Sequence, residues 1–86
     1  MKKTYVIKDE VGLHARPASV LVNVANRYPN EISISHNGKT VSLKSIMIVM
    51  SLGVPANAEI TIEVLGDKPE VIHQELEAVL VQHEVI

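Results

Sequence analysis

The chain contains no cysteine, tryptophan or phenylalanine, and its only aromatic side chains are Tyr5 and Tyr28. Without cysteine there can be no disulfide and no thiolate zinc site. So few aromatic rings leave no stacking platform for nucleic-acid bases, and a net charge of −2 provides no basic stripe for a phosphate backbone. We therefore expect no direct contact with nucleic acid.

Long apolar runs are also missing. No stretch approaches the roughly 20 apolar residues that span a bilayer. Residues 1–4 lack the apolar core of a signal peptide. We expect no membrane insertion and a cytoplasmic location.

The composition fits one small folded unit. The chain has 86 residues, of which 47% are apolar, enough for a core of Val, Ile, Leu and Ala but not for a deep substrate cavity beside it. No linker and no internal repeat interrupts the sequence. The sequence therefore predicts a single domain over residues 1–86.

Strand and helix patterns alternate along the chain. Strands are expected over residues 4–8, 32–35, 40–44 and 60–64, and helices from about 15 to 27, over a short segment near 45–53, and from about 67 onward. Asn37 and Gly38 form the strongest hairpin signal, because both accept positive φ in a type I′ turn. Asp67 is expected to cap the last helix, with Pro69 in its first turn. The order β-α-β-β-α-β-α predicts an α+β fold with the helices on one side of a sheet.

The segment best suited to chemistry surrounds a histidine, and reads Gly12-Leu13-His14-Ala15-Arg16-Pro17-Ala18. Pro17 is best tolerated in the first turn of a helix, which places His14 at or near the N-cap, where free amides and the positive dipole end point outward. An imidazole there can carry a transferred phosphoryl group. The amides of Ala15 and Arg16 and the Arg16 guanidinium would solvate its charge. The alternative is that His14 is only a surface or capping side chain.

Residues 45–53 form a second unusual segment, which is short and apolar all round. At about 100° per residue, a helix divides it into two arcs. The arcs are Ile46, Met47 and Met50, and Ile48, Val49 and Leu52. Only one arc can face the core, so we expect the first to form an exposed apolar patch. The alternative is that loops or the first helix cover both arcs.

Ser45 stands in the N-cap position of this short helix, where its hydroxyl can accept a backbone hydrogen bond. A serine at this place is usually only a cap. A phosphate on it would nevertheless be tolerated by the helix dipole without refolding the domain.

These two segments together resemble the HPr family, the histidine-containing phosphocarriers of the bacterial phosphotransferase system. The Ser45-Ile46-Met47 and Met50-Ser51-Leu52-Gly53 motifs follow His14 at the family's spacing. The similarity spans essentially the whole chain, including the hairpin over 37–41 and the strand over 58–62.

The resemblance implies an open-faced β-sandwich, with four antiparallel strands covered on one side by three helices. It implies a phosphoryl carrier rather than an enzyme, with no metal and no cofactor. His14 would accept a phosphoryl group on Nδ1 from enzyme I and pass it to the IIA domain of a sugar permease. Arg16 would stabilise the phosphoryl group. The implied partner-binding residues are Ala15, Arg16, Ile46, Met47 and Met50.

The stretch from Lys44 to Met47 resembles the form found in low-GC Gram-positive bacteria. In that form HPr kinase/phosphorylase modifies the serine, here Ser45. The seryl-phosphorylated protein then acts as corepressor of a LacI-type catabolite regulator.

One residue departs from the family pattern. Ile48 stands where the family commonly has glycine. On the helical wheel Ile48 lies beside Val49 and Leu52. We therefore expect it to be mostly buried and to displace the short helix slightly outward.

Two other functions compete with that of a phosphoryl carrier. The first is a purely regulatory HPr-like module that acts through Ser45 and the patch of Ile46, Met47 and Met50; the intact His14 and Arg16 count against it. The second is a metal-dependent hydrolase that uses the four histidines, but these show no ligand spacing. They are His14, His36, His73 and His83.

Overall fold

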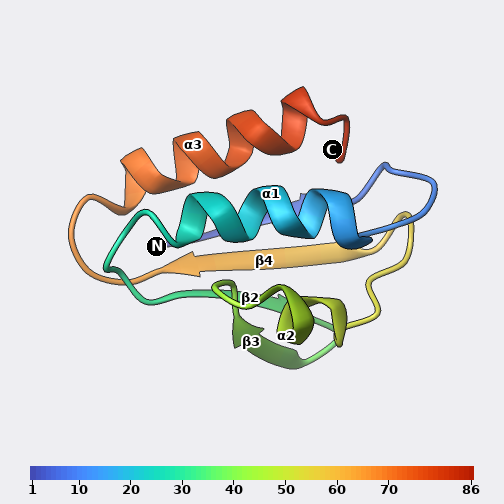
Figure 1. The fold of residues 1–86 in the computed structure, drawn as a ribbon, viewed down its shortest axis with the longest axis horizontal. Helices are drawn as coiled ribbons and strands as arrows, with labels where there is room; N and C mark the ends of the chain where they lie inside the picture. The colour runs from blue at the N-terminus through green and yellow to red at the C-terminus, as the bar shows by residue number, and fades with distance from the viewer.

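The sheet contains the four strands that the sequence indicates. A computed structural model describes all 86 residues. The strands are β1 (Lys2–Val6), β2 (Ile32–His36), β3 (Lys39–Ser42) and β4 (Glu59–Val64). They pair antiparallel in the order β1-β4-β2-β3 (Figure 1).

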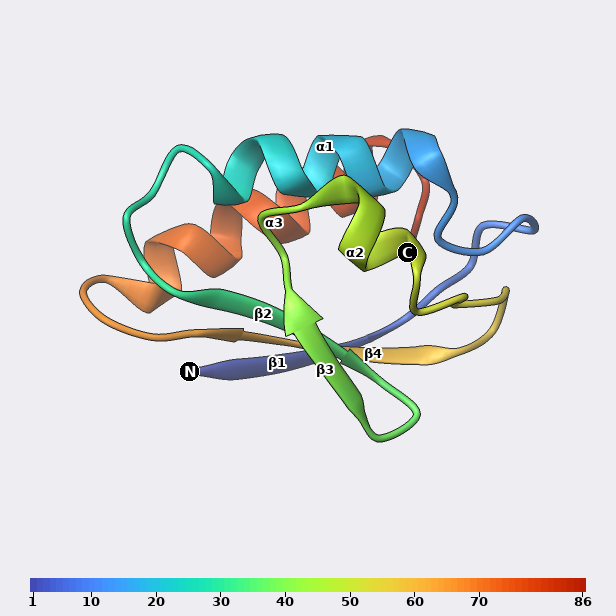
Figure 2. The same ribbon diagram turned by 60° about the horizontal axis from the view of Figure 1, so that its bottom comes forward.

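Three helices cover one face of this sheet. They are α1 (Ala15–Ala25), α2 (Ile46–Met50) and α3 (Pro69–Gln82). In Figure 2 the helices lie above the strands, and the opposite face of the sheet is uncovered. The predicted α+β, open-faced fold with the order β-α-β-β-α-β-α is confirmed.

The strand alternation decides which face of the sheet the helices cover. In β4, Ile60, Ile62 and Val64 are buried while the residues between them are half-exposed. The buried residues join one core cluster of 20 apolar side chains. On the uncovered face hydroxyl groups bond to one another, Thr4 to Thr61 at 3.0 Å and Ser35 to Thr40 at 2.7 Å, so this face is polar and can remain in water.

The hairpin between β2 and β3 has the predicted turn. Asn37 and Gly38 have φ of 51° and 82°, and His36 pairs with Lys39 on either side of them. Two residues with positive φ are the mark of the type I′ turn.

Four expectations about where elements begin or end need correction. The first strand runs from Lys2 to Val6 rather than over 4–8, because the Lys8 amide leaves the ladder and donates to the Val85 carbonyl at 2.7 Å. The first helix ends at Ala25, not at 27. The third strand runs from Lys39 to Ser42 rather than over 40–44. Asp67 does not cap α3: the N-cap is Lys68, which has φ of 51° and makes no side-chain capping bond.

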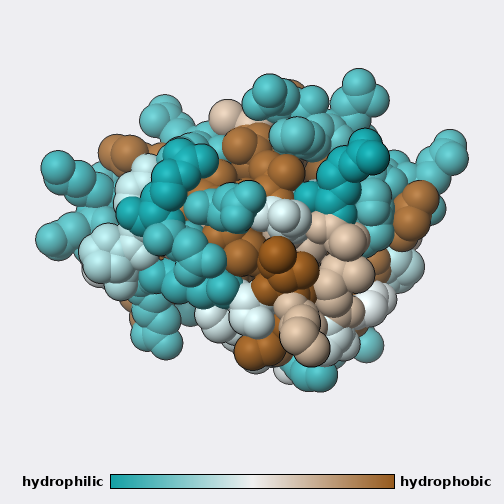
Figure 3. Space-filling model, viewed as in Figure 1, coloured by the Kyte–Doolittle hydropathy of each residue, from teal (hydrophilic) through white to brown (hydrophobic).

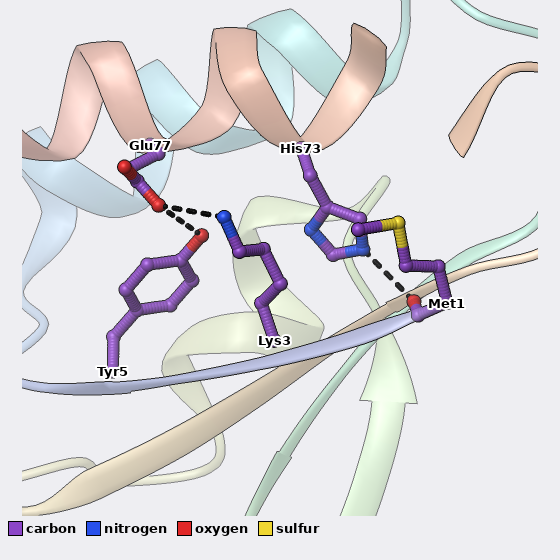
Figure 4. A network of polar contacts seen from close by, with 5 residues as sticks. All are labelled: Met1, Lys3, Tyr5, His73 and Glu77. Atoms are coloured by element: carbon purple, nitrogen blue, oxygen red, sulfur yellow. Dashed lines mark hydrogen bonds and ion pairs between the residues drawn. The ribbon is translucent and has the colours of Figure 1, made fainter. Parts of the chain in front are cut away.

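A polar network joins α3 to the edge strand β1 (Figure 4). Glu77 accepts hydrogen bonds from Lys3 Nζ at 3.0 Å and from the Tyr5 hydroxyl at 3.1 Å. The bond from Lys3 is the main cause that lowers the pKa of Glu77, while burial, aided by Glu77, raises the pKa of Tyr5 to about 12. His73 is buried beside this network, and its Nε2 donates to the Met1 carbonyl at 2.8 Å. These contacts fix α3 against the end of the sheet.

None of the three helices combines the length and the apolar character needed to cross a membrane.

Candidate functional site

His14 is the N-cap of α1, as the position of Pro17 predicts. Its backbone is extended, with φ of −89° and ψ of −171°, and its carbonyl accepts the Ala18 amide at 3.1 Å. The amides of Ala15 and Arg16 donate to no protein acceptor, and the first turn contains no acidic side chain. Two free N–H donors and an uncompensated positive dipole end therefore lie beside the imidazole.

The loop that leads to His14 is held against a distant segment of the chain. The Leu13 amide donates to the Val54 carbonyl at 2.9 Å. Gly12 has φ of +80°, and a Cβ at this position would overlap the Val54 carbonyl oxygen. Only glycine fits here, so the path of the loop into α1 depends on Gly12.

Asp9 is a site residue that the sequence analysis missed. Its Oδ2 lies 3.3 Å from Nε2 of His14, and its Oδ1 accepts the Val11 amide at 2.9 Å. The Val11 amide is the main cause that lowers the pKa of Asp9, and His14 and Arg16 act in the same direction. An aspartate side chain that accepts the backbone amide two residues further along the chain forms an Asx turn. Nothing local in the sequence indicates that this turn faces His14.

Arg16 is exposed on the first turn of α1. Its guanidinium takes part in none of the ion pairs of the chain, which are Lys3–Glu77, His14–Asp9 and Arg27–Glu75. All five of its N–H donors are therefore available to an anion that binds at the helix start.

Ser45 is the N-cap of α2, as predicted. Its Oγ accepts the Ile48 amide at 3.5 Å. The neighbouring Lys44 is held on both sides, because its Nζ donates to the Tyr28 carbonyl at 2.6 Å and its own carbonyl accepts Asn26 Nδ2 at 3.1 Å. These contacts place the start of α2 beside the C-terminal end of α1.

The surface of α2 forms an apolar patch, as expected. Val49 is the one buried residue of the helix. The other four are exposed by 38% (Ile46), 84% (Met47), 46% (Ile48) and 38% (Met50). In Figure 3 brown and tan surface covers the position of α2 in the lower centre of the view. We call these four residues the α2 patch.

The expectation that Ile48 is mostly buried is wrong. The residue that faces the core is Val49, and at about 100° per residue Ile48 and Met50 lie on its two flanks while Met47 lies almost opposite. The exposures follow this order, with Met47 the most exposed. Leu52, which the helical wheel places beside Ile48, lies beyond the end of the helix and is only half-buried, so it does not mark the face that meets the core. Ile48 therefore adds to the patch and does not press the helix away from the core.

The corrected position of Ile48 changes what its replacement does. We expect Ile48→Gly to lower the free energy of unfolding by only about 1–2 kcal/mol, from the helix-propensity difference and the loss of a half-buried side chain. The matched control is Val49→Gly in the same helix, where the loss of a buried side chain adds roughly 1.5–3 kcal/mol. Urea unfolding of both variants measures the two values. Equal losses would show that Ile48 is part of the core.

His14 and Ser45 lie at opposite ends of α1. The contact between Asn26 and Lys44 anchors the start of α2 near the end of α1, while Leu13 contacts Val54, beyond the other end of α2. With a rise of 1.5 Å per residue, the two ends of α1 are about 18 Å apart. The His14 imidazole is therefore largely screened from a charge on Ser45. The same charge would, however, border the α2 patch, which lies between Ser45 and His14.

The four histidines do not come together. His73 is on the buried face of α3, and His36 is on β2, where its Nδ1 faces the Glu59 carbonyl at 3.3 Å. No group of three or more His, Asp or Glu side chains is placed to hold a metal ion. The arrangement that a metal-dependent hydrolase needs is not present among these side chains.

A family model described as "PTS HPr component phosphorylation site" matches residues 1–82, which include His14, Ser45 and the α2 patch. The chain belongs to the HPr family. It is accordingly a phosphocarrier of the phosphotransferase system and not a catalyst.

Solved structures agree with this assignment over nearly the full length. The histidine-containing phosphocarrier protein of Mycoplasma is 38% identical, with a TM-score of 0.96, over 100% of this chain and 98% of that one. HPr from Bacillus anthracis is 39% identical, with a TM-score of 0.82, over 92% and 94%. Crh, the catabolite repression protein of Bacillus subtilis, is 36% identical, with a TM-score of 0.72, over 95% and 93%. The HPr fold thus accommodates both carrier and catabolite-repression proteins.

Proposed function

We propose that His14 accepts a phosphoryl group from the phosphohistidine of enzyme I and passes it to the IIA domain of a sugar permease. The observation that carries this proposal is the pair of free amides, from Ala15 and Arg16, beside an imidazole at a helix N-cap. Nδ1 is the acceptor atom, because Nε2 already contacts Asp9.

The transfer is a displacement at phosphorus. The Nδ1 lone pair forms the new N–P bond, and the electron pair of the old N–P bond returns to the nitrogen of the donor. The free amides and the Arg16 guanidinium bind the phosphoryl oxygens, whose charge they stabilise in the transition state. Transfer to the IIA domain is the same step in reverse direction, with His14 as the leaving group.

Partner docking is assigned to the surface next to His14. Ala15 and Arg16 are exposed on the first turn of α1, and the α2 patch adds Ile46, Met47, Ile48 and Met50. Exposed apolar patches with adaptable Met side chains suit a carrier that must bind several partners in turn.

Ser45 is proposed as the site of regulation by HPr kinase/phosphorylase, and its phosphorylated form as a corepressor for a LacI-type catabolite regulator. The hydroxyl stands at the helix start, where the dipole favours negative charge. The rival is a purely regulatory module, which the likeness to Crh favours. The two functions differ in whether His14 is used.

The test is reconstitution with enzyme I, labelled phosphoenolpyruvate and a IIA domain. The proposal predicts that label enters this chain and then the IIA domain. A chain that takes no label from enzyme I but is phosphorylated at Ser45 by ATP and the kinase would establish the regulatory module instead.

Arg16→Ala is expected to slow transfer in both directions by about tenfold or more, because a charge-assisted hydrogen bond is worth roughly 1.5–3 kcal/mol. Arg16→Lys should recover only part of the rate, since lysine keeps the charge but lacks the planar fork. Arg27→Ala, at the far end of α1, is the control. Rates for Arg16→Ala that match those of Arg27→Ala would remove Arg16 from the site.

Ser45→Asp is expected to slow phosphorylation by enzyme I by about 10- to 100-fold, because it places a negative charge at the edge of the docking patch. Aspartate is as good an N-cap as serine, so the fold should be unaffected or slightly stabilised. Ser42→Asp places the same charge on the exposed β3 and is the control. A Ser45→Asp variant as fast as wild type would contradict the docking role of this surface.

A further inference from the structure

The Asp9 carboxylate is held in place by contacts other than the one to His14. Its Oδ1 accepts the Val11 amide at 2.9 Å, and its backbone carbonyl accepts the Gly12 amide at 2.9 Å. On the other side, the Lys8 and Asp9 amides both donate to the Val85 carbonyl, at 2.7 and 3.4 Å. The second carboxylate oxygen is thus presented to the imidazole by a loop that is fixed from both sides.

The contact between this oxygen and His14 determines which ring nitrogen carries a proton. Oδ2 lies 3.3 Å from Nε2, and both side chains are partly shielded, with exposures of 22% and 34%. The pKa of Asp9 lies below its ordinary value, chiefly because of the Val11 amide, so the group is ionised at neutral pH. An ionised carboxylate only accepts, so Nε2 must be the donor and Nδ1 is left with its lone pair.

We propose that Asp9 is a positioning residue that fixes His14 in the Nε2–H tautomer and thereby makes Nδ1 the nucleophile. The consequence for transfer rests on the function proposed above; the tautomer itself does not. During transfer the Nδ1–P bond forms while the proton stays on Nε2, so the ring becomes cationic beside the Asp9 carboxylate. When the phosphoryl group leaves, the bonding pair returns to Nδ1 and the ring departs as neutral imidazole.

No other side chain can take over this role. The other charged or titratable groups around Asp9 are Arg16 on α1 and four residues that line, together with Asp9 itself, a pocket of about 400 Å³. Those four are Lys8, Glu10, His83 and Glu84. Asp9 is the one residue that forms a hydrogen bond or ion pair with Nε2 of His14.

The chain contains its own reference for each tautomer. His36 contacts the Glu59 carbonyl through Nδ1 at 3.3 Å, and His73 contacts the Met1 carbonyl through Nε2 at 2.8 Å. A carbonyl oxygen only accepts, so neutral His36 carries its proton on Nδ1 and neutral His73 carries it on Nε2. The measurement uses uniformly ¹⁵N-labelled full-length protein at a pH where the histidines are neutral. The ring ¹⁵N chemical shifts of His36 and His73 then show the two tautomer patterns, and the shifts of His14 are compared with them.

The Asp9→Asn variant is expected to change the tautomer of His14 while it keeps the structure of the loop. The Asn oxygen can keep the bond to the Val11 amide, which turns the NH₂ group toward Nε2 and forces that nitrogen to accept. The proton then moves to Nδ1, and the tautomer ratio shifts by roughly three- to tenfold or more. Glu10→Gln removes the neighbouring exposed carboxylate and is the matched control.

The proposal predicts that His14 resembles His73 in wild type and in Glu10→Gln, and that it moves toward the His36 pattern in Asp9→Asn. It also predicts that phosphorylation of Asp9→Asn by enzyme I slows by about three- to tenfold or more, in proportion to the shift of the tautomer ratio, because the nucleophilic nitrogen is then protonated in most molecules. A wild-type His14 in the Nδ1–H form, or an unchanged tautomer in Asp9→Asn, would overturn the proposal.

Different results would refute the role of Asp9 and the carrier function. A shifted tautomer with an unchanged transfer rate would refute the role of Asp9 in the reaction. The expected tautomers in a wild-type protein that takes no label from enzyme I would refute the carrier function and leave the Asp9–His14 assignment standing.

Discussion

Replacing His14 with alanine is expected to abolish the acid-labile label that enzyme I and phosphoenolpyruvate place on the chain. His14 is the histidine with free helix amides and an unpaired arginine beside it. The fold should survive, because the side chain is exposed by 34% and makes no capping bond to α1. Loss of label therefore reports on chemistry rather than on unfolding.

The controls for this variant are the other surface histidines. His36→Ala and His83→Ala remove imidazoles that lie away from any helix N-terminus, on β2 and at the C-cap of α3. Both should accept the normal amount of label. Label that survives in His14→Ala and disappears in either control would place the acceptor elsewhere.

Gly12→Ala is expected to have the largest effect on stability. Its φ of +80° costs an L-residue roughly 1–2 kcal/mol. Its Cβ would also overlap the Val54 carbonyl and lie 2.9 Å from Pro55 backbone atoms, so the loop and its bond to Leu13 must shift. We expect a total loss of about 3 kcal/mol or more, which corresponds to a fall in Tm of roughly 12–24 °C for a domain of this size.

Gly38→Ala separates the two contributions to this loss. Gly38 has nearly the same φ, +82°, but no atom within 4 Å of its Cβ position. Only the conformational cost of about 1–2 kcal/mol should remain. Thermal unfolding of both variants gives the comparison. Equal falls in Tm would show that the close approach of Gly12 to Val54 contributes nothing.

Local rules account for the parts of the fold that the sequence predicted. Pro17 places the start of α1, and therefore His14, because the ring is tolerated only in the first turn. Asn37 and Gly38 determine the hairpin because few other residues adopt positive φ in succession. Ser45 caps α2 by a bond to its own helix. Each of these features depends on residues within a few positions of one another.

The features that the sequence did not predict depend on contacts between distant segments. The hydrophobic pattern of α2 leaves open which residue faces the core, and only the packed structure selects Val49 over Ile48. The buried His73 has its hydrogen-bond partner in Met1, 72 positions away in the chain. The Asp9 loop reaches His14 because Val85 and Val54 hold the flanking segments. None of these partners can be read from a local window.

If Nδ1 of His14 carries the phosphoryl group, the N–P bond itself can be observed. ¹⁵N-labelled protein phosphorylated by enzyme I and phosphoenolpyruvate should show ¹⁵N–³¹P coupling at one ring nitrogen. We expect this nitrogen to be Nδ1 of His14, with the proton retained on Nε2. Coupling at Nε2, coupling at another histidine, or phosphate found only on Ser45 would contradict it.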